Sequence, residues 1–157
     1  MKTENLQEWI GKTEERSDLL NAFPANAMAA TLNHEKFNYS ENKNLPPLWH
    51  WLYFLPIFRL SEAGYDGHAA LGDFLPPVQL PRRMWAGSRI EFLSPLKIGN
   101  EYKKKSNIKD VTAKSGRSGD LVFVTVSHEV SNGTKICINE EHDIVYREKA
   151  ASSSGPA

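Results

Sequence analysis

The second half of the chain is dominated by runs of β-branched and aromatic residues that turn-forming residues separate. Such runs predict strands, and we expect four, over residues 82–92, 101–112, 121–130 and 135–147. In the third run Val122, Val124 and Val126 fall on one face, as strand alternation requires. The dipeptide Asn132-Gly133 is the strongest short hairpin signal and predicts that the last two strands pair. We therefore expect an antiparallel meander, in which the lysine-rich second strand lies at an edge or presents a solvated face.

The first half of the chain predicts one helix and a long loop. Apolar residues spaced by three and four predict a helix over about 17–32, which Pro24 should kink or split. Prolines interrupt the aromatic-rich segment that follows, so only a short strand or helix is expected around 49–54. Residues 61–79 are rich in glycine and proline and predict a long loop, and long loops are often functional. One helix laid on an antiparallel sheet is an α+β arrangement.

Composition bounds the organisation of the chain and the partners it can have. With 157 residues, of which 40% are hydrophobic, the chain can bury one core of its own. We expect one domain over residues 1–148, followed by a flexible linker or added tail over 149–157. A net charge of zero offers no general field for a phosphate backbone, so nucleic acid is not an expected partner.

The cellular setting is also constrained. The single cysteine, Cys137, excludes an intramolecular disulfide framework and points to a reducing compartment. No apolar run is long enough to span a bilayer, and residues 1–15 are too acidic and polar for a secretory signal. We therefore expect a cytoplasmic protein that does not bind membranes.

Histidine and acidic residues are the first candidates for chemistry. His128 shares a strand face with the valines, and this position favours a buried, hydrogen-bonded core histidine over a catalytic one. Asp66 and His68 lie two residues apart in the glycine-rich loop and are weak candidates for a catalytic pair. His142 and Asp143 are adjacent in a strand, so they should point to opposite faces. No spacing typical of metal ligands occurs, and we expect no metal site.

The remaining candidates are two arginines, a cysteine and a glycine-containing turn. Arg82 and Arg83 directly follow the long loop, and paired guanidiniums suit phosphate or carboxylate ligands. An equally good interpretation is that one is solvated and the other is paired with an acid. Cys137 is expected to be a small packed residue rather than a nucleophile. Residues 116–119 lack the lysine of a nucleotide-binding loop and should simply connect two strands.

A series of short motifs extends from about Trp9 to Arg147. In chain order they are LPPLWHWLYF at 45–54, GH at 67–68, FLPP at 74–77, LPRRMWAG at 80–87, GRSG at 116–119, LVFVTV at 121–126 and DIVYR at 143–147. Together they resemble the N-terminal half of the MaoC-like hydratases of the mesaconyl-CoA and itaconyl-CoA hydratase type. These are relatives of the mitochondrial hydroxyacyl-thioester dehydratase type 2.

This resemblance implies a hot-dog fold, in which a curved antiparallel sheet wraps a helix. It also implies reversible hydration of a 2-enoyl thioester of coenzyme A or acyl carrier protein, without a cofactor. In that family the catalytic Asp and His lie in a second hot-dog half, where they position water and transfer protons. The Asp-x-Asn-x-x-His run of the MaoC signature does not occur in these 157 residues. The resemblance therefore implies a module that shapes the acyl pocket and pairs with a second hot-dog or with another copy of itself.

The resemblance also carries over a set of expected acyl-pocket or interface positions. They are Trp49, Trp51, His68, Arg82, Arg83, Met84 and Trp85. No catalytic residue is assigned beyond the weak candidates Asp66 and His68. Two alternatives stay open, namely a stand-alone acyl-CoA thioesterase and a non-catalytic module that binds acyl thioesters. The acyl group is open among short dicarboxylyl, methyl-branched and longer enoyl chains.

Overall fold

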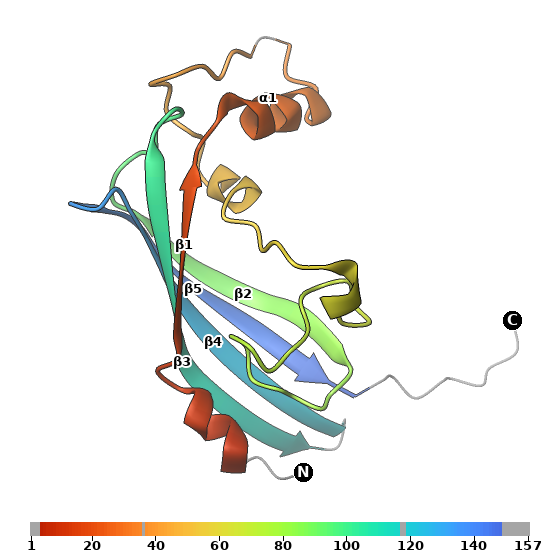
Figure 1. Cartoon of the computed structure of the whole chain (residues 1–157). Helices are drawn as coiled ribbons and strands as arrows, with labels where there is room; N and C mark the ends of the chain where they lie inside the picture. The colour runs from red at the N-terminus through yellow and green to blue at the C-terminus, as the bar shows by residue number, and fades with distance from the viewer. Residues whose placement is uncertain (1–3, 36, 117–118, 149–157) are drawn as a thin grey trace, which may run out of the picture.

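The structure, a computed structural model, describes residues 4–35, 37–116 and 119–148. Five strands form one antiparallel sheet in the order β1-β3-β4-β5-β2, and one α-helix accompanies it, so the α+β prediction is confirmed (Figure 1). The strands are β1 (Thr13–Leu19), β2 (Arg82–Phe92), β3 (Glu101–Gly116), β4 (Gly119–Ser131) and β5 (Ile136–Arg147). The helices are α1 (Ala22–Thr31) and the 3-10 turns η1 (Glu4–Trp9), η2 (Trp49–Leu52) and η3 (Leu60–Glu62). The predicted linker at 149–157 lies outside the described residues.

The four predicted strands are present, and the hairpin between the last two is confirmed. Strand β2 has the predicted bounds, whereas β3 and β4 extend further than expected. In the β4–β5 turn, the Asn132 side chain accepts hydrogen bonds from the backbone N–H groups of Thr134 and Lys135. Gly133 has a φ of +89°, a left-handed conformation that glycine adopts without strain. Residues 116 and 119 pair across the predicted connection between β3 and β4, and Arg117 and Ser118 lie outside the described residues.

The predicted strand order is wrong in one respect. Strand β2 does not pair with β3 but lies beyond β5, where Arg82 pairs with Arg147 and Phe92 with Ile138. Strand β1 takes the place beside β3, so the lysine-rich strand is not an edge strand. Its solvated face is confirmed, because Lys103 and Lys105 are exposed. The connection from β2 to β3 therefore has to pass β5 and β4, and it contributes Leu96 and Ile98 to the buried core. The local sequence pattern does not encode this crossing.

The predicted start of the helix is also wrong. Residues 17–19 belong to β1, and α1 begins at Ala22 behind the N-cap Asn21, whose side-chain oxygen accepts a hydrogen bond from the N–H of Phe23. Pro24 lies in the first turn of α1, where backbone N–H groups have no partner within the helix. It therefore neither kinks nor splits the helix. The short element expected around 49–54 is the turn η2, and 61–79 is irregular apart from the end of η3.

Two apolar clusters cover opposite ends of the inner face of the sheet. The first lies beneath α1 and η2 and contains Leu20, Ala25, Tyr53, Tyr102, Val130 and Ile138 among others. The second lies beneath residues 71–80 and contains Ile108, Val122, Val124, Val126 and Tyr146 among others. Cys137 is buried in the first cluster, as predicted. Among the described helices, none has the length and apolar content needed to cross a membrane.

Candidate functional site

A band of polar residues crosses the inner face of the sheet between the two apolar clusters. Ser106, His128 and Glu140 lie directly opposite one another on β3, β4 and β5. Lys104 and His142 lie on the same face and flank this row. Buried polar groups destabilise a fold unless they find partners. A polar band between two apolar clusters is therefore a candidate site, and we call these five residues the polar band.

Each end of the polar band is held by specific contacts. His128 Nδ1 lies 2.9 Å from Ser106 Oγ, and the rings of His128 and His142 are 6.4 Å apart between centroids. The Glu140 carboxylate is only 5% exposed and lies 3.2 Å from His50 Nε2. Both of its oxygens accept the indole N–H of Trp51, also at 3.2 Å. The turn η2 is thereby fastened to β5.

The backbone on either side of η2 is unusual. Leu48 and Phe54 flank the turn, and their φ angles are positive, at 72° and 58°. Residues other than glycine rarely adopt positive φ angles. Strain of this kind persists only where the surroundings hold it in place. Here the backbone N–H of Phe54 donates to the Asp18 carboxylate at 2.8 Å, which anchors the segment to β1. The chain is therefore held in a shape that directs His50 and Trp51 toward Glu140.

Burial controls the ionisation of the polar band. Burial, aided by the nearby charge of Lys104, lowers the pKa of His128 to about 4. Burial also lowers the pKa of His142 and that of Lys104. For Glu140 burial opposes ionisation, but the hydrogen bonds from His50 and Trp51 outweigh it, and its pKa is lowered. At neutral pH the polar band therefore contains the neutral imidazoles of His128 and His142 beside the ionised carboxylate of Glu140.

Lowering the pH from 7 to about 4.5 is expected to destabilise the fold. A histidine in the unfolded chain titrates near 6.5 and the folded His128 near 4, so protons bind preferentially to the unfolded chain between these values. The free energy of unfolding should fall by up to about 3 kcal/mol across this window. Urea unfolding at several pH values measures this fall in the free energy of unfolding.

The His128→Ala variant should lose about 1 to 3 kcal/mol of unfolding free energy at pH 7, because the substitution leaves a cavity and a Ser106 hydroxyl without its partner. Its unfolding free energy should then fall less in acid than that of the parent. An equally steep pH dependence in the variant would contradict the assignment.

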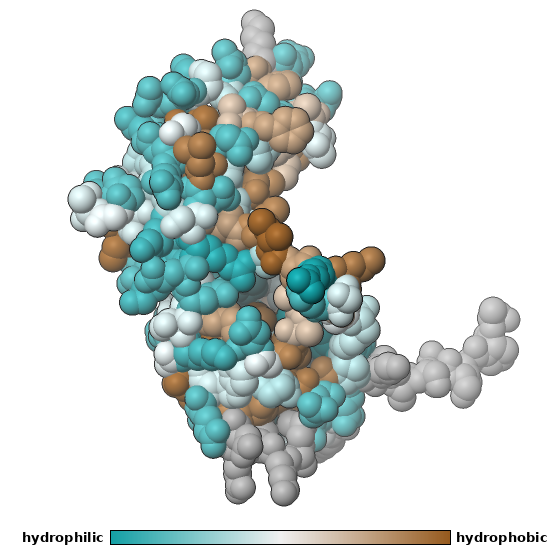
Figure 2. All heavy atoms as spheres, viewed as in Figure 1, coloured by the Kyte–Doolittle hydropathy of each residue, from teal (hydrophilic) through white to brown (hydrophobic). Residues whose placement is uncertain are grey.

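Four residues of the polar band, all except Ser106, form the floor of a pocket of about 510 Å³, which we call the central pocket. Its walls come from residues 50–51 and 53–56, His68 and Trp85. A neighbouring pocket of about 330 Å³ shares His68, Lys104, His128 and His142 with it and continues toward residues 69–75. Figure 2 shows the surface hollowed between α1 and the segment that carries η3, with hydrophobic side chains at the rim. The inner face thus carries one cleft with a polar floor and largely apolar walls.

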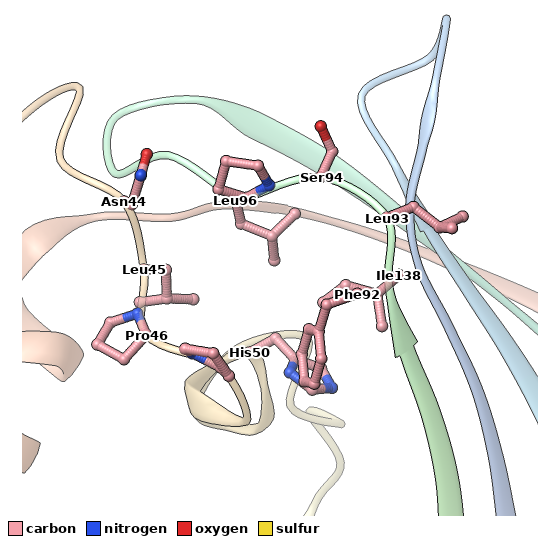
Figure 3. Close-up of a pocket in the computed structure, with 11 residues that line it drawn as sticks. Asn44, Leu45, Pro46, His50, Phe92, Leu93, Ser94, Leu96 and Ile138 are labelled. Carbon is pink, nitrogen blue, oxygen red and sulfur yellow. The ribbon is translucent and has the colours of Figure 1, made fainter.

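A separate cavity of about 390 Å³ lies on the other side of His50 (Figure 3). Leu45, Pro46, Phe92 and Leu96 line it together with Ile138 near the start of β5, so it is largely apolar. Among the described residues, His50 alone lines both this cavity and the central pocket. The cavity holds no cluster of groups that could transfer protons, and we place the candidate site in the central pocket.

The structure distributes the expected site residues among several places. Trp51, His68 and Trp85 line the central pocket. Trp49 packs in the first apolar cluster against Tyr39, with 5.1 Å between ring centroids.

The Asp66 carboxylate contacts both its loop neighbour His68 and one of the two arginines, Arg83. The carboxylate of Asp66 pairs with Arg83 Nη2 at 2.9 Å and accepts the backbone N–H of His68 at 3.2 Å. Arg82 and Met84 lie on the opposite face of β2, and Arg82 is exposed. Of the two interpretations of the arginines, the one with a solvated and an acid-paired side chain therefore describes their contacts.

Two further sequence expectations can be compared with the structure. His142 faces the cleft, whereas Asp143 pairs with Arg89 at 2.6 Å on the outer face, so the prediction that they do not form a dyad is confirmed. His128 is hydrogen-bonded and largely buried, as predicted, although it also lines the cleft. Within the ranges that the structure describes, no group of three or more His, Cys, Asp or Glu side chains is arranged to hold a metal ion.

Sequence reasoning missed His50, Lys104 and Glu140. For Lys104 and Glu140 the sequence did contain a signal, because each places a charged residue at a strand position where the alternation predicts an apolar one. Glu140 occupies an inward position two residues after Ile138, and Lys104 an inward position two residues after Tyr102. A charged residue at an inward position of a paired interior strand is itself a reason to expect a site.

Comparisons with known proteins place the chain in a family. Residues 48–157 match the family of hydroxyacyl-thioester dehydratase type 2. The chain is 45% identical over 156 residues to the mesaconyl-C(4)-CoA hydratase of Chloroflexus aurantiacus. That match covers 99% of this chain and 56% of the relative, so the chain spans little more than half the relative's length.

Solved structures confirm the hot-dog fold. A chain of the ChsH1-ChsH2 complex from Mycobacterium tuberculosis aligns with a TM-score of 0.66 and 13% identity, over 99% of this chain and 94% of that one. HtdX from the same organism aligns with a TM-score of 0.51 and 12% identity, over 87% of this chain and 51% of that one. From the extent of its family match, the chain belongs to the hydroxyacyl-thioester dehydratase type 2 family.

Proposed function

We propose that this chain is a hot-dog module of an enoyl-CoA hydratase, in which it shapes the acyl pocket and pairs with a second, catalytic hot-dog. The observation that carries the proposal is the central pocket, which joins apolar walls to a polar floor and is bordered by exposed hydrophobic side chains. The 45% identity to a hydratase that acts on a CoA thioester supports the reaction class. Phe54, Leu55 and Trp85 offer the apolar contacts that an acyl chain needs.

The chemistry of the polar band suits binding better than proton transfer. A general acid or base works best with a pKa near the working pH, whereas the pKa of His128 is about 4. Glu140, the carboxylate in the central pocket, is occupied by His50 and Trp51. Neutral imidazoles can still hydrogen-bond a thioester oxygen or a water molecule. We therefore assign the proton transfers to a second hot-dog, as the MaoC resemblance implies.

The border of the central pocket supports the pairing. Ile57 is 100% exposed, Leu60 91% and Tyr65 78%, and all three lie on the segment that follows the pocket wall. Leu55 and Trp85, which line the pocket itself, are 64% and 63% exposed. Clusters of exposed large hydrophobic residues mark interaction surfaces. Since 156 residues are 56% of the Chloroflexus relative, about 120 of its residues lie outside the match, which is enough for a second domain.

Replacing Ile57 and Leu60 together by aspartate is expected to weaken association at least about tenfold, because two charges would be buried without partners in an apolar interface. In the absence of a second domain, another copy of the chain should occupy this surface, so light scattering across a concentration series measures the effect. The fold should be unchanged in circular dichroism, because both side chains are exposed. Phe23→Asp, which alters a 78% exposed residue on α1, is the matched control and should associate like the parent. A parent chain that stays monomeric, or a double variant that associates equally well, would contradict the pairing.

A further inference from the structure

The cavity of about 390 Å³ on the other side of His50 is bordered by a buried polar atom without a partner. His50 Nδ1 is buried and forms no hydrogen bond among the residues that the structure describes. The His50 side chain as a whole is only 3% exposed. Buried polar atoms are almost always hydrogen-bonded, because an unpaired one destabilises the fold. A ligand in the cavity would supply the partner.

The other ring nitrogen of His50 determines what kind of partner Nδ1 needs. Nε2 lies 3.2 Å from the Glu140 carboxylate. Burial opposes the ionisation of Glu140, but the hydrogen bonds from His50 and Trp51 lower its pKa. An ionised carboxylate only accepts hydrogen bonds, so Nε2 carries the proton. In the neutral ring Nδ1 is then an acceptor with a free lone pair, and its partner has to be a hydrogen-bond donor.

Nδ1 is directed away from the central pocket. Glu140 lines the central pocket but is not among the residues that line the cavity. The two nitrogens occupy different edges of the imidazole ring, so Nδ1 faces away from Glu140 when Nε2 faces toward it. In Figure 3 the His50 ring lies at one end of the cavity beside Phe92, with 6.1 Å between the ring centroids. A donor that reaches Nδ1 would therefore lie in the cavity.

The rest of the cavity wall offers no charge and little further polarity. The backbone N–H groups of Leu93 and Ser94 already donate to the Cys137 carbonyl, at 2.8 and 3.1 Å. Figure 3 shows the side chains of Asn44 and Ser94 pointing away from the His50 ring. No Lys, Arg, Asp or Glu is among the described residues that line the cavity. A charged ligand would be buried there without a counter-ion, so the wall favours a neutral one.

We propose that this cavity binds a neutral, largely apolar molecule with one hydroxyl group, and that the hydroxyl donates a hydrogen bond to His50 Nδ1. The cavity volume of about 390 Å³ lies in the range of small-molecule sites. Leu45 and Leu96 supply apolar contacts for the body of such a molecule. Phe92 and Leu93 are exposed, so the cavity is reachable from solvent. This site is distinct from the central pocket, and the inference does not depend on the proposed function.

The test compares phenol with toluene, in which a methyl group replaces the hydroxyl. Each is titrated into the isotopically labelled chain, and NMR follows the backbone amides and the imidazole nitrogens of His50. Phenol is expected to shift the amides of Leu45 and Leu93 and to move the Nδ1 resonance to lower frequency, which is the effect of accepting a hydrogen bond. Toluene should shift the same amides and leave the Nδ1 resonance nearly unchanged.

Two glutamine variants isolate the hydrogen bond. In His50→Gln the amide nitrogen takes the place of Nε2 and can still donate to Glu140, but no acceptor occupies the position of Nδ1. The ratio of phenol affinity to toluene affinity should therefore fall about 3- to 10-fold, the usual net contribution of one hydrogen bond. His68→Gln makes the same exchange in the central pocket and is the matched control, so its ratio should equal that of the parent. Circular dichroism checks that both variants fold.

Two kinds of result would overturn the inference. Failure of the parent chain to bind phenol, or amide shifts confined to residues 53–56 and Trp85, would show that the cavity is not the site. An unchanged Nδ1 resonance while the cavity amides move, or an unchanged affinity ratio in His50→Gln, would show that no hydroxyl reaches His50. The resonance is measured on the parent chain, so the test stands even where the variant does not fold. No thioester is involved, so these results leave the proposed function unaffected.

Discussion

Replacing Glu140 by leucine is expected to lower the free energy of unfolding by about 3 kcal/mol or more. The carboxylate is 5% exposed and accepts hydrogen bonds from His50 and Trp51. His50 is itself only 3% exposed, and its Nδ1 already has no partner among the described residues. Without Glu140 both ring nitrogens would be buried without partners, and η2 would lose its attachment to β5. Urea unfolding of the parent and the variant measures the difference.

The neighbouring residue provides a matched control for this prediction. Glu141 points to the outer face, where it pairs with Arg89 at 2.8 Å and with Lys109. Because these ion pairs are largely solvated, Glu141→Leu should change the stability by less than about 1 kcal/mol. Adding His50→Leu to Glu140→Leu should recover part of the loss, since both partners are then apolar. Equal losses for the two single glutamate variants would show that the buried cluster contributes no more than a surface pair.

Local pattern predicted those elements whose side chains alternate between core and solvent. In β4 the inward positions are Val122, Val124 and Val126, so its face and approximate bounds were readable from the sequence. Strand β1 was missed because its inward residues, Glu14, Arg16 and Asp18, are all polar, and no hydrophobic period marks it. Those polar residues are there for local reasons, since Asp18 anchors the strained backbone at residue 54.

The site was less predictable than the fold because its contacts join distant segments. Arg83 meets Asp66 through the folding of the long loop, and His50 meets Glu140 across 90 residues of sequence. The pairing of β2 with β5 is equally non-local. Residue type left the two arginines open between anion ligands and one solvated plus one acid-paired side chain, whereas the structure shows that Arg83 is paired with Asp66. Strand alternation places Lys104 on the inner face, but it cannot show which charges already have partners.

The chain by itself is expected to hydrate enoyl-CoA thioesters about 100- to 10,000-fold more slowly than it does together with a catalytic hot-dog. This factor is the usual contribution of a positioned general acid and base. Within the polar band, the pKa of His128 is about 4, which makes it a weak base, and burial also lowers the pKa of His142. The Glu140 carboxylate already accepts hydrogen bonds from His50 and Trp51. No Asp-x-Asn-x-x-His run is present to position water. The same reasoning predicts no appreciable hydrolysis of the thioester.

The most direct measurement is turnover of crotonyl-CoA and mesaconyl-CoA by the purified chain of 157 residues. Loss of the enoyl-thioester absorbance reports hydration, and a thiol reagent reports release of coenzyme A. The proposed function predicts little or no hydration and no thiol release from the chain alone. Release of thiol would instead favour a thioesterase. Hydration by the chain alone at about 1 to 1,000 per second, the ordinary range for enzymes, would contradict the account and place a catalytic residue, such as Asp66 or His68, in this module.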